Sequence, residues 1–491
     1  MKHFLEKCLL TFIATMVSLI LGVSNLSAQN EVTAAYEPTA QFAASQGYYA
    51  ADAADWEARI SSLESQLKKK QDKPDPKKGF TRVIDGRVYF DSYSINQSGS
   101  DTGTPSVNTL KNYNGIRDLR VGVKGEGYGI FDYKVDLCFI EGTGTVSGVE
   151  GVSFNRSGVN FKDVWFGVKN VPLLEYVRIG HYRIEEGVSV LTGGTNTTFL
   201  EFDGRDFATG RRIGISSRHL WAKDQIRFFA GFFYNENLAQ NQRYSIRDNQ
   251  GSITNLRLTF LSNVSRKEGK IDGKRFVLFG GNYSYFDANK STPSTYVNSS
   301  FTERFATVDQ MTLASYSVPT NGYHKFGLEF AAQNGPLSVQ SEAYVNQYNS
   351  VKIGTTTKDR TIFGSYLTVR YFLTGDYRKF SADNAAWGAV DQKHNLDLKK
   401  VGDHNFAEWL GAWEIAAKWG YVETSQLFGL SGTNGFAGSV NDFTLGLNWY
   451  WNPQTRWLFN YIHAVPSQIR DGQSRDHSDT DIFAASFRYN F

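Results

Sequence analysis

The sequence is poor in cysteine and proline and has no long apolar segment after its first residues. Only two of its 491 residues are cysteines, Cys8 and Cys138, and ten are prolines. After residue 28, no run approaches the roughly 18 apolar residues that suggest a transmembrane helix. This absence excludes a helical membrane protein. The formal net charge is only +3, and this near-neutral balance gives no reason to expect a nucleic-acid partner.

The first 28 residues are typical of a secretory signal peptide, removed before the protein folds. Two lysines precede an apolar run from Leu9 to Val23, and small residues lead to a cleavage site after Ala28. Removing residues 1–28, with two lysines and one glutamate, leaves 50 basic and 48 acidic residues. It also removes Cys8, so Cys138 is alone and no disulfide can form within the chain.

Three short segments follow the predicted signal peptide. Residues 29–51 are small and polar and predict a flexible leader, and residues 71–79 form a linker rich in proline and lysine. Between them, residues 52–70 predict a short helical coiled coil. Its a and d positions are Trp56, Ile60, Leu63 and Leu67. Two heptads are marginal alone, so this helix would need a multimer; the alternative is an amphipathic helix lying on the rest of the protein.

From residue 80 onwards, apolar and polar residues alternate, most clearly between Asp442 and His463. One face of this stretch carries Phe443, Leu445, Leu447, Trp449 and Trp451. A period of two predicts strands, and Asn452–Gln454 supplies a turn between them. A face so rich in Trp, Phe and Leu needs a cover, yet the sequence contains no helical layer. Lipid is the simpler partner, and the aromatics suit a membrane interface.

Sixteen such alternating segments occur. They are 82–93, 117–125, 128–140, 160–169, 175–183, 211–218, 225–234, 252–261, 275–286, 323–333, 337–348, 361–373, 411–422, 442–451, 455–463 and 481–491. Short links alternate with long polar ones, and an even number of strands lets the first and last pair. The sequence therefore predicts an all-β fold: a 16-stranded antiparallel transmembrane β-barrel over 80–491, in the outer membrane, preceded by the coiled-coil segment.

Several stretches resemble the phosphate-selective porin O and P family. They are GRVYFDSY (86–93), FATGRRIGI (207–215), GSYLTVRYFLTGDYRKF (364–380), GAWEIAAKWGY (411–421) and LGLNWYWNPQTRWLFNYIH (445–463). The resemblance implies a trimeric, sixteen-stranded porin whose basic residues attract anions into the pore. It also implies that the C-terminal aromatic residue, here Phe491, is the signal that barrel assembly machinery recognises.

The alternation directs basic side chains into the predicted lumen. They are Arg87, Arg120, Lys124, Lys134, Arg178, Arg212, Arg227 and Arg257, with Lys325, Arg370, Lys418, Arg456 and Arg488. Narrow water-filled pores focus the field of such charges. Carboxylates share the lumen, at Asp85, Asp136, Asp163, Glu329, Glu342 and Glu414. An anion-attracting wall and a weakly selective wall of ion pairs therefore both remain open.

The loop from Arg183 to Arg211 is the expected constriction, because the resemblance implies an inward loop there. It includes Arg183, Glu185, Glu186, Glu201, Asp203 and Arg205, and the pair Arg211 and Arg212 follows. The resemblance also implies that the following residues lie in or near the anion path: Arg87, Arg117, Lys134, Asp163 and Arg257. Departures occur where the family has a second arginine and, in the loop, a lysine and two serines; the residues here are Asp118, Val190, Gly193 and Gly194. Phosphate specificity therefore does not follow from the resemblance.

No catalytic, cofactor or metal constellation is evident in the sequence. The histidines are scattered, no Gly-x-Ser-x-Gly elbow or P-loop occurs, and the acidic stretch 471–481 matches no cation-binding loop. We therefore expect no enzyme and no cofactor. Two functions remain: a homotrimeric porin for passive diffusion of small hydrophilic solutes, modestly selective for anions, or an envelope protein whose closed barrel anchors the 52–70 coiled coil.

Overall fold

The computed structural model describes most of the chain after Lys78. Its described residues are 79–97, 112–141, 159–201, 203, 207–234, 251–287, 296–302, 312–353, 355–400, 409–427, 438–470, 473–476 and 479–491. The predicted signal peptide, leader, coiled coil and linker up to Lys78 lie outside them. The coiled-coil residues Trp56, Ile60, Leu63 and Leu67 are therefore not described.

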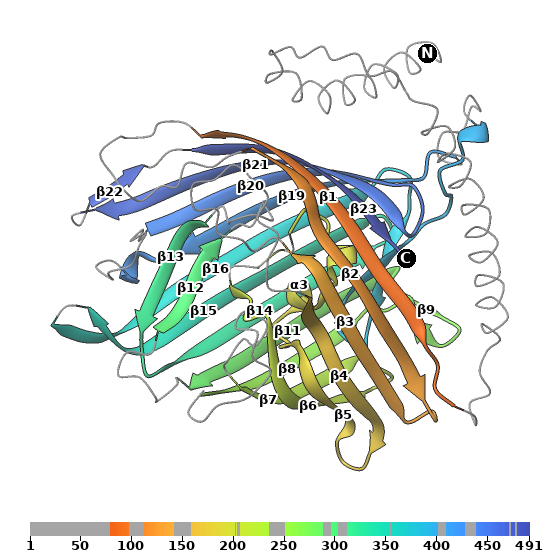
Figure 1. The fold of residues 1–491 in the computed structure, drawn as a ribbon, viewed down its shortest axis with the longest axis horizontal. Coiled ribbons are helices and arrows are strands. Elements are labelled where there is room, and N and C mark those ends of the chain that lie inside the picture. Colours follow the sequence, from red (N-terminus) through yellow and green to blue (C-terminus); the bar gives the residue numbers. More distant parts are fainter. Residues whose placement is uncertain are drawn as a thin grey trace, which may run out of the picture. The chain divides into compact units, whose positions relative to one another are not determined.

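Sixteen strands of the described residues close into one antiparallel barrel (Figure 1). They are β1 (Val83–Gln97), β2 (Tyr113–Gly127), β3 (Phe131–Glu141), β4 (Asn160–Val171), β5 (Glu175–Arg183), β6 (Arg211–Trp221), β7 (Ile226–Tyr234), β8 (Ser252–Ser262), β11 (Arg275–Asp287), β14 (Gly322–Asn334), β15 (Leu337–Ile353), β16 (Thr356–Phe372), β19 (Ala412–Glu423), β20 (Gly438–Tyr450), β21 (Thr455–Arg470) and β23 (Thr480–Asn490). Each pairs with the next, and β1 pairs with β23 from Arg87↔Asn490 to Gln97↔Thr480. The ring therefore has no free edge.

The predicted barrel is confirmed, because each predicted alternating segment corresponds to one of these strands. The stretch from Asp442 to His463 forms parts of β20 and β21, with Trp449 opposite Trp457. β15 and β16 extend beyond their predicted limits and pair as far as Ile353↔Thr356. Short strands lie outside the ring: β9 (Arg266–Lys267), β10 (Lys270–Ile271), β12 (Tyr296–Thr302), β13 (Thr312–Pro319) and β22 (Gln473–Asp476).

The outer face of the barrel is apolar. In β8 every second residue from Ile253 to Leu261 is buried in the lumen, whereas the intervening Leu256, Leu258 and Phe260 are exposed. An aromatic group on the outer face surrounds the turn between β20 and β21, where Trp449 stacks on Trp413 with ring centroids 5.1 Å apart. An apolar outer face with aromatic residues at the strand ends is suited to contact with lipid.

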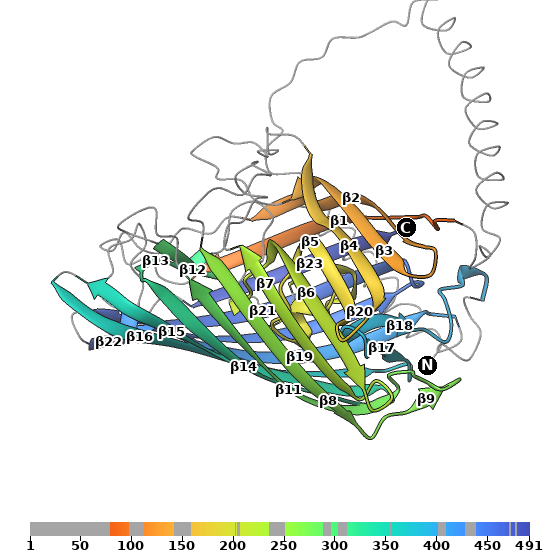
Figure 2. The same cartoon turned by 90° about the horizontal axis from the view of Figure 1, so that it is seen from below.

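Two links between strands fold into the barrel from opposite ends (Figure 2). The link from β5 to β6, which we call the loop insert (184–210), carries α3 (Val188–Leu191) and the 3-10 turn η1 (Gly194–Asn196). The link from β16 to β19, which we call the hairpin insert (373–411), carries β17 (Tyr377–Ser381), β18 (Ala386–Asp391) and η3 (Leu398–Lys400). The sequence predicts only short turns at the end of the barrel where β16 joins β19. The hairpin insert was therefore not predicted.

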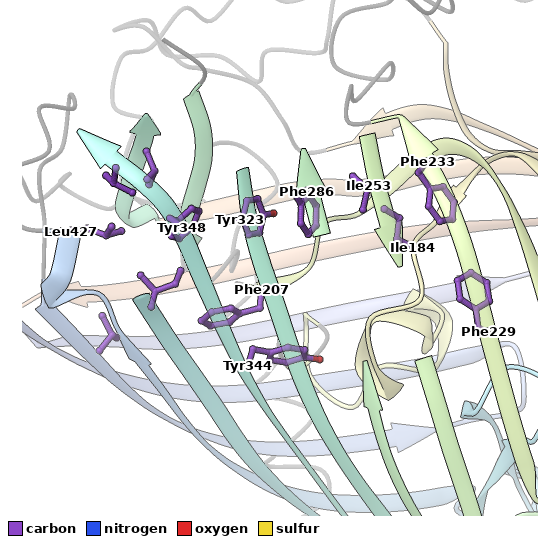
Figure 3. Packing of buried hydrophobic residues seen from close by; sticks show 14 of the residues in the cluster. Ile184, Phe207, Phe229, Phe233, Ile253, Phe286, Tyr323, Tyr344, Tyr348 and Leu427 are labelled. Atoms are coloured by element: carbon purple, nitrogen blue, oxygen red, sulfur yellow. The ribbon is translucent and has the colours of Figure 1, made fainter. Parts of the chain in front are cut away.

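Apolar packing fixes the loop insert to the barrel wall. Ile184 and Phe207, near its two ends, join a buried cluster with residues of several strands (Figure 3). Phe207 stacks on Tyr344 of β15, with ring centroids 5.5 Å apart. Gly364 of β16 makes room for this ring, because a Cβ there would lie 2.0 Å from it. A side chain at position 364 would therefore displace Phe207, whose ring lies beside Tyr344 in Figure 3.

The two inserts also pack against each other. Val188 of α3 shares a buried cluster with Phe380 and Trp387 of the hairpin insert and with Phe276 of β11. The Phe276 and Phe380 rings are 4.3 Å apart. The inserts therefore form a continuous packed body inside part of the barrel.

Within the described residues, no helix is both long and apolar enough to cross a membrane.

Candidate functional site

The inserts divide the inward-facing wall into two halves that differ in access to solvent. The side chains of Arg227, Arg257 and Lys325 are at most 2 % exposed. Those of Arg87 and Lys134 are 16 % and 25 % exposed, respectively. We call the wall from β1 to β6 the solvated half and the remaining wall, from β7 to β23, the packed half.

Arginines of the packed half hold the second part of the loop insert. Arg370 of β16 donates to the Asp203 carboxylate (2.9 Å) and to the Thr198 hydroxyl (2.6 Å). Burial raises the pKa of the Asp203 carboxyl, and the nearby Arg370 opposes that shift. The charged form of Asp203 is therefore stabilised by the arginine and not by solvent. Arg488 of β23 donates to the Thr197 hydroxyl (2.7 Å) and to the Leu200 carbonyl (2.7 Å).

The first part of the loop insert is held by buried ion pairs. Arg227 of β7 lies 2.6 Å from the Glu185 carboxylate, and Lys325 of β14 lies 3.0 Å from that of Glu186. Arg257 of β8 makes a two-pronged pair with Glu329, at 2.8 and 2.7 Å. Two of the predicted pore-lining cations, Arg227 and Arg257, thus contact the inserts and are removed from solvent.

The hairpin insert is clamped by the same arginines. Arg257 donates to the Ala385 carbonyl at 2.9 Å, and Arg227 donates to the Asp383 carbonyl at 2.6 Å. In return, Arg378 of the hairpin insert forms a two-pronged pair with Glu414 of β19, at 3.0 and 2.7 Å. Isolated buried charges are costly, and these pairs satisfy them with hydrogen bonds.

In the solvated half, basic side chains are also paired with carboxylates, and Arg87 and Lys134 remain accessible whereas Arg120 is buried. Asp118 accepts from both Arg87 and Arg120, each at 2.7 Å. Lys124 lies 2.6 Å from Asp85. One carboxylate therefore engages two arginines of the predicted anion path.

Further along the solvated half, Asp163 is also shared. Arg211 donates to it at 2.8 Å, and Lys134 lies 3.5 Å from it. Arg117 forms ion pairs with Glu201 of the loop insert and, at 3.3 Å, with Asp91. Mixed charge is therefore a general feature of this wall.

Arg178 is different because it rests on aromatic rings. Its guanidinium lies 4.2 Å from the Trp165 ring centroid and 5.3 Å from that of Tyr182, and its Nε donates to the Tyr176 hydroxyl at 3.1 Å. Within the described ranges, no carboxylate forms a salt bridge with Arg178. Cation–π contacts hold a guanidinium in place without cancelling its charge.

The predicted constriction loop does enter the lumen, and its tip meets β1. A Cβ at Gly194 would lie 3.1 Å from Nη1 of Arg87. Arg183 donates to the Val190 carbonyl at 2.5 Å, and Arg212 donates to the Thr209 carbonyl at 3.0 Å. These contacts place both arginines where the loop insert leaves and rejoins the wall.

Most of the predicted site residues are brought to the lumen. The solvated half carries Arg87, Arg117, Arg120, Lys124, Lys134, Arg178, Arg183, Arg211 and Arg212, and the packed half carries Arg227 and Arg257. Glu185, Glu186, Glu201 and Asp203 lie in the loop insert, whereas Arg205 lies outside the described residues. Phe491 pairs with Gly86 through two backbone hydrogen bonds, at 2.9 and 3.1 Å.

Arg378 and the hairpin insert were missed by sequence reasoning. The available signal was the length of the link between the predicted strands 361–373 and 411–422, at an end where turns are otherwise short. The described residues contain no group of three or more His, Cys, Asp and Glu side chains that could hold a metal ion.

Comparisons with known proteins match the chain to one family model and to several solved barrels. The family model of phosphate-selective porin O and P matches residues 92–491. No curated protein sequence matches the chain. Among solved structures, the barrel is similar to the trimer form of OmpT, an outer membrane protein of Vibrio cholerae, with 11% identity, a TM-score of 0.43, and coverage of 84% of this chain and 100% of that one.

Two further solved structures are similar at the same low level of identity. The outer membrane channel DcaP of Acinetobacter baumannii is 10% identical, with a TM-score of 0.46 over 84% of this chain and 98% of that one. OprB of Pseudomonas putida is 8% identical, with a TM-score of 0.47 over 89% of this chain and 97% of that one.

Proposed function

The chain belongs to the phosphate-selective porin O and P family, and from that premise we propose that its barrel passes small hydrophilic solutes with a modest preference for anions. Family membership makes the chain an outer-membrane porin, and porins are channels and not enzymes. The nature of the solute and the degree of selectivity are the parts that we propose.

The proposed path follows the solvated half of the wall. Basic side chains there, such as Arg87 and Lys134, face the lumen and remain accessible to solvent. The packed half contributes less, because the inserts cover Arg227, Arg257 and Lys325 there. We place the constriction between the solvated half and the tip of the loop insert at Gly194.

Arg178 is the observation that supports a preference for anions. Its neighbours in the solvated half largely balance one another, as Asp118 does for Arg87 and Arg120. Arg178 instead keeps its charge on the faces of Trp165 and Tyr182. An arginine is charged at any physiological pH, and a fixed cation in a narrow pore raises the local concentration of anions.

The same balance argues against a tight phosphate site. Holding phosphate requires several convergent charged donors that replace its water. Asp118 takes one donor each from Arg87 and Arg120, and Gly193 and Gly194 offer no hydroxyl at the loop tip. We therefore propose that phosphate passes without being held.

The reversal potential in a potassium chloride gradient across a planar bilayer tests the proposal. The unmodified channel should be modestly selective for chloride, and Arg178→Gln should move the potential towards cation selectivity. Arg266→Gln, in the outlying β9–β10 hairpin, is the matched control and should leave it unchanged. Cation selectivity in the unmodified channel would contradict the proposed anion preference, and a barrel without conductance would favour the envelope-anchor alternative.

We also propose that the porin is a homotrimer, exported by its predicted signal peptide and inserted through recognition of Phe491. The support is the heptad spacing in 52–70 together with the family resemblance. Replacing Ile60 and Leu63 by Asp puts charge into the predicted seam, where its burial is costly. The temperature at which trimers dissociate on a gel should fall. An unchanged dissociation temperature would exclude a role for this segment in assembly.

A further inference from the structure

Arg456 of β21 is a buried arginine with unused hydrogen-bond donors. Its side chain points into the barrel beside the turn between β20 and β21, and the residue is 3% exposed. Nη1 donates to the Tyr450 hydroxyl at 3.3 Å. Nε and Nη2 are buried without a hydrogen-bond partner among the described residues. A guanidinium cannot lose its proton to escape this position, and a buried charged donor needs an acceptor.

The surroundings of Arg456 are rich in positive charge. Arg488 stands directly opposite it on β23 and donates to neutral oxygens of the loop insert, including the Gly194 carbonyl at 3.0 Å. Arg378 is the third buried arginine, and it is paired with Glu414. Among these three arginines, Arg378 alone forms a salt bridge within the part of the chain that the structure describes.

A small cavity lies beside Arg456. Its volume is about 20 Å³, and its lining includes Asn196 at the tip of the loop insert, Gln392 of the hairpin insert and Asn490 of β23. A cavity of this volume has room for one water molecule or one monatomic ion. A small monatomic anion suits this volume and the positive charge beside it.

We propose that this cavity binds a single small inorganic anion of the size of chloride, which accepts hydrogen bonds from Nε and Nη2 of Arg456. The anion offsets the surplus positive charge of Arg456 and Arg488. Because Asn196 and Gln392 line the same cavity, the bound anion ties the loop insert and the hairpin insert to the barrel wall. The site lies behind the tip of the loop insert, next to the proposed constriction at Gly194, and the anion is a resident part of the structure.

Bromide is the probe that locates the anion. Crystals of the unmodified protein grown with bromide as the only halide should give an anomalous peak in the cavity, within hydrogen-bond distance of Arg456. This measurement needs no variant and therefore does not depend on whether a substitution folds. An absence of anomalous signal beside Arg456 would overturn the proposal, because a water molecule would then be the occupant.

Thermal unfolding in detergent gives a second measurement on the full chain. At equal ionic strength, sodium chloride should raise the melting temperature above that in sodium gluconate by roughly 2 °C, because gluconate is too large for the cavity. Arg456→Met should remove this difference, whereas the control Arg266→Gln should retain it. Equal melting temperatures of the unmodified protein in both salts, or a difference that survives in Arg456→Met, would contradict the proposed site.

Discussion

The two halves of the barrel wall use the same kind of ion pair in different surroundings. In the packed half, Arg257 and Glu329 are wholly removed from solvent. In the solvated half, Arg87 and Asp118 form a pair of similar length, 2.7 Å, yet solvent reaches the arginine. Desolvation makes a buried pair expensive to break, whereas screening makes an accessible pair worth little. One set of pairs therefore fixes the inserts, and the other sets the charge that a solute meets.

The largest expected effect comes from breaking a pair in the packed half. Arg257→Gln leaves Glu329 buried without its cation, and the free energy of unfolding should fall by about 3–5 kcal/mol. Guanidinium unfolding in detergent measures the loss. The matched substitution Arg87→Gln in the solvated half should cost less than about 1 kcal/mol. Equal losses in the two variants would mean that the halves do not differ as described.

The packing of the loop insert can be tested with a pair of glycines. Gly364→Val forces a side chain against the Phe207 ring, which a Cβ would approach to 2.0 Å. We expect a loss of about 1–3 kcal/mol from this overpacking and a larger single-channel conductance as the insert moves.

Gly281→Val is the control for that change. Gly281 faces outward on β11, where the nearest atom would be 3.4 Å from a Cβ, an ordinary contact distance. The free energy of unfolding should stay within about 0.5 kcal/mol of that of the unmodified protein. The single-channel conductance should stay unchanged within experimental error. A conductance change of equal size in both glycine variants would show that the loop insert does not limit the pore.

The clearest change of selectivity is expected from the carboxylate that Arg87 and Arg120 share. Asp118→Asn frees Arg87 and Arg120 from their shared carboxylate while keeping the side-chain shape. The reversal potential should move towards chloride, and phosphate should begin to block the chloride current. Arg87→Gln should move the potential in the opposite direction. A shift of Asp118→Asn towards potassium would refute the assignment of this wall to the solute path.

Most of the barrel could be predicted because the patterns that define its strands lie within short stretches of sequence. Alternation at period two shows which residues of β8 or β20 face lipid, and the register follows once short turns join neighbouring strands. The same parity directs Arg178, Arg227 and Arg257 to the inward face. Sequence alone could not tell that Arg227 and Arg257 are covered.

That difference depends on the inserts, whose paths are set by tertiary contacts. The loop insert was placed by family resemblance, and nothing periodic in 184–210 predicts it. The hairpin insert has a two-residue period of its own, in which Arg378 and Phe380 are both buried. In the sequence, this pattern looks like a continuation of β16. Only the packing of Phe380 and Trp387 on Phe276 shows where that segment lies.

The seam between β1 and β23 has a consequence for how the barrel forms. The Tyr89 hydroxyl donates to Asn490, 401 positions away along the chain, so the contact that closes the ring joins nearly opposite ends of the folded unit. Bringing such distant segments together costs roughly 5 kcal/mol of chain entropy and slows folding. Until β23 arrives, β1 and β21 both expose unpaired backbone. A chain whose translation stops before Thr480 would therefore form a sheet with two unpaired edge strands. Such edges tend to pair with strands of other chains.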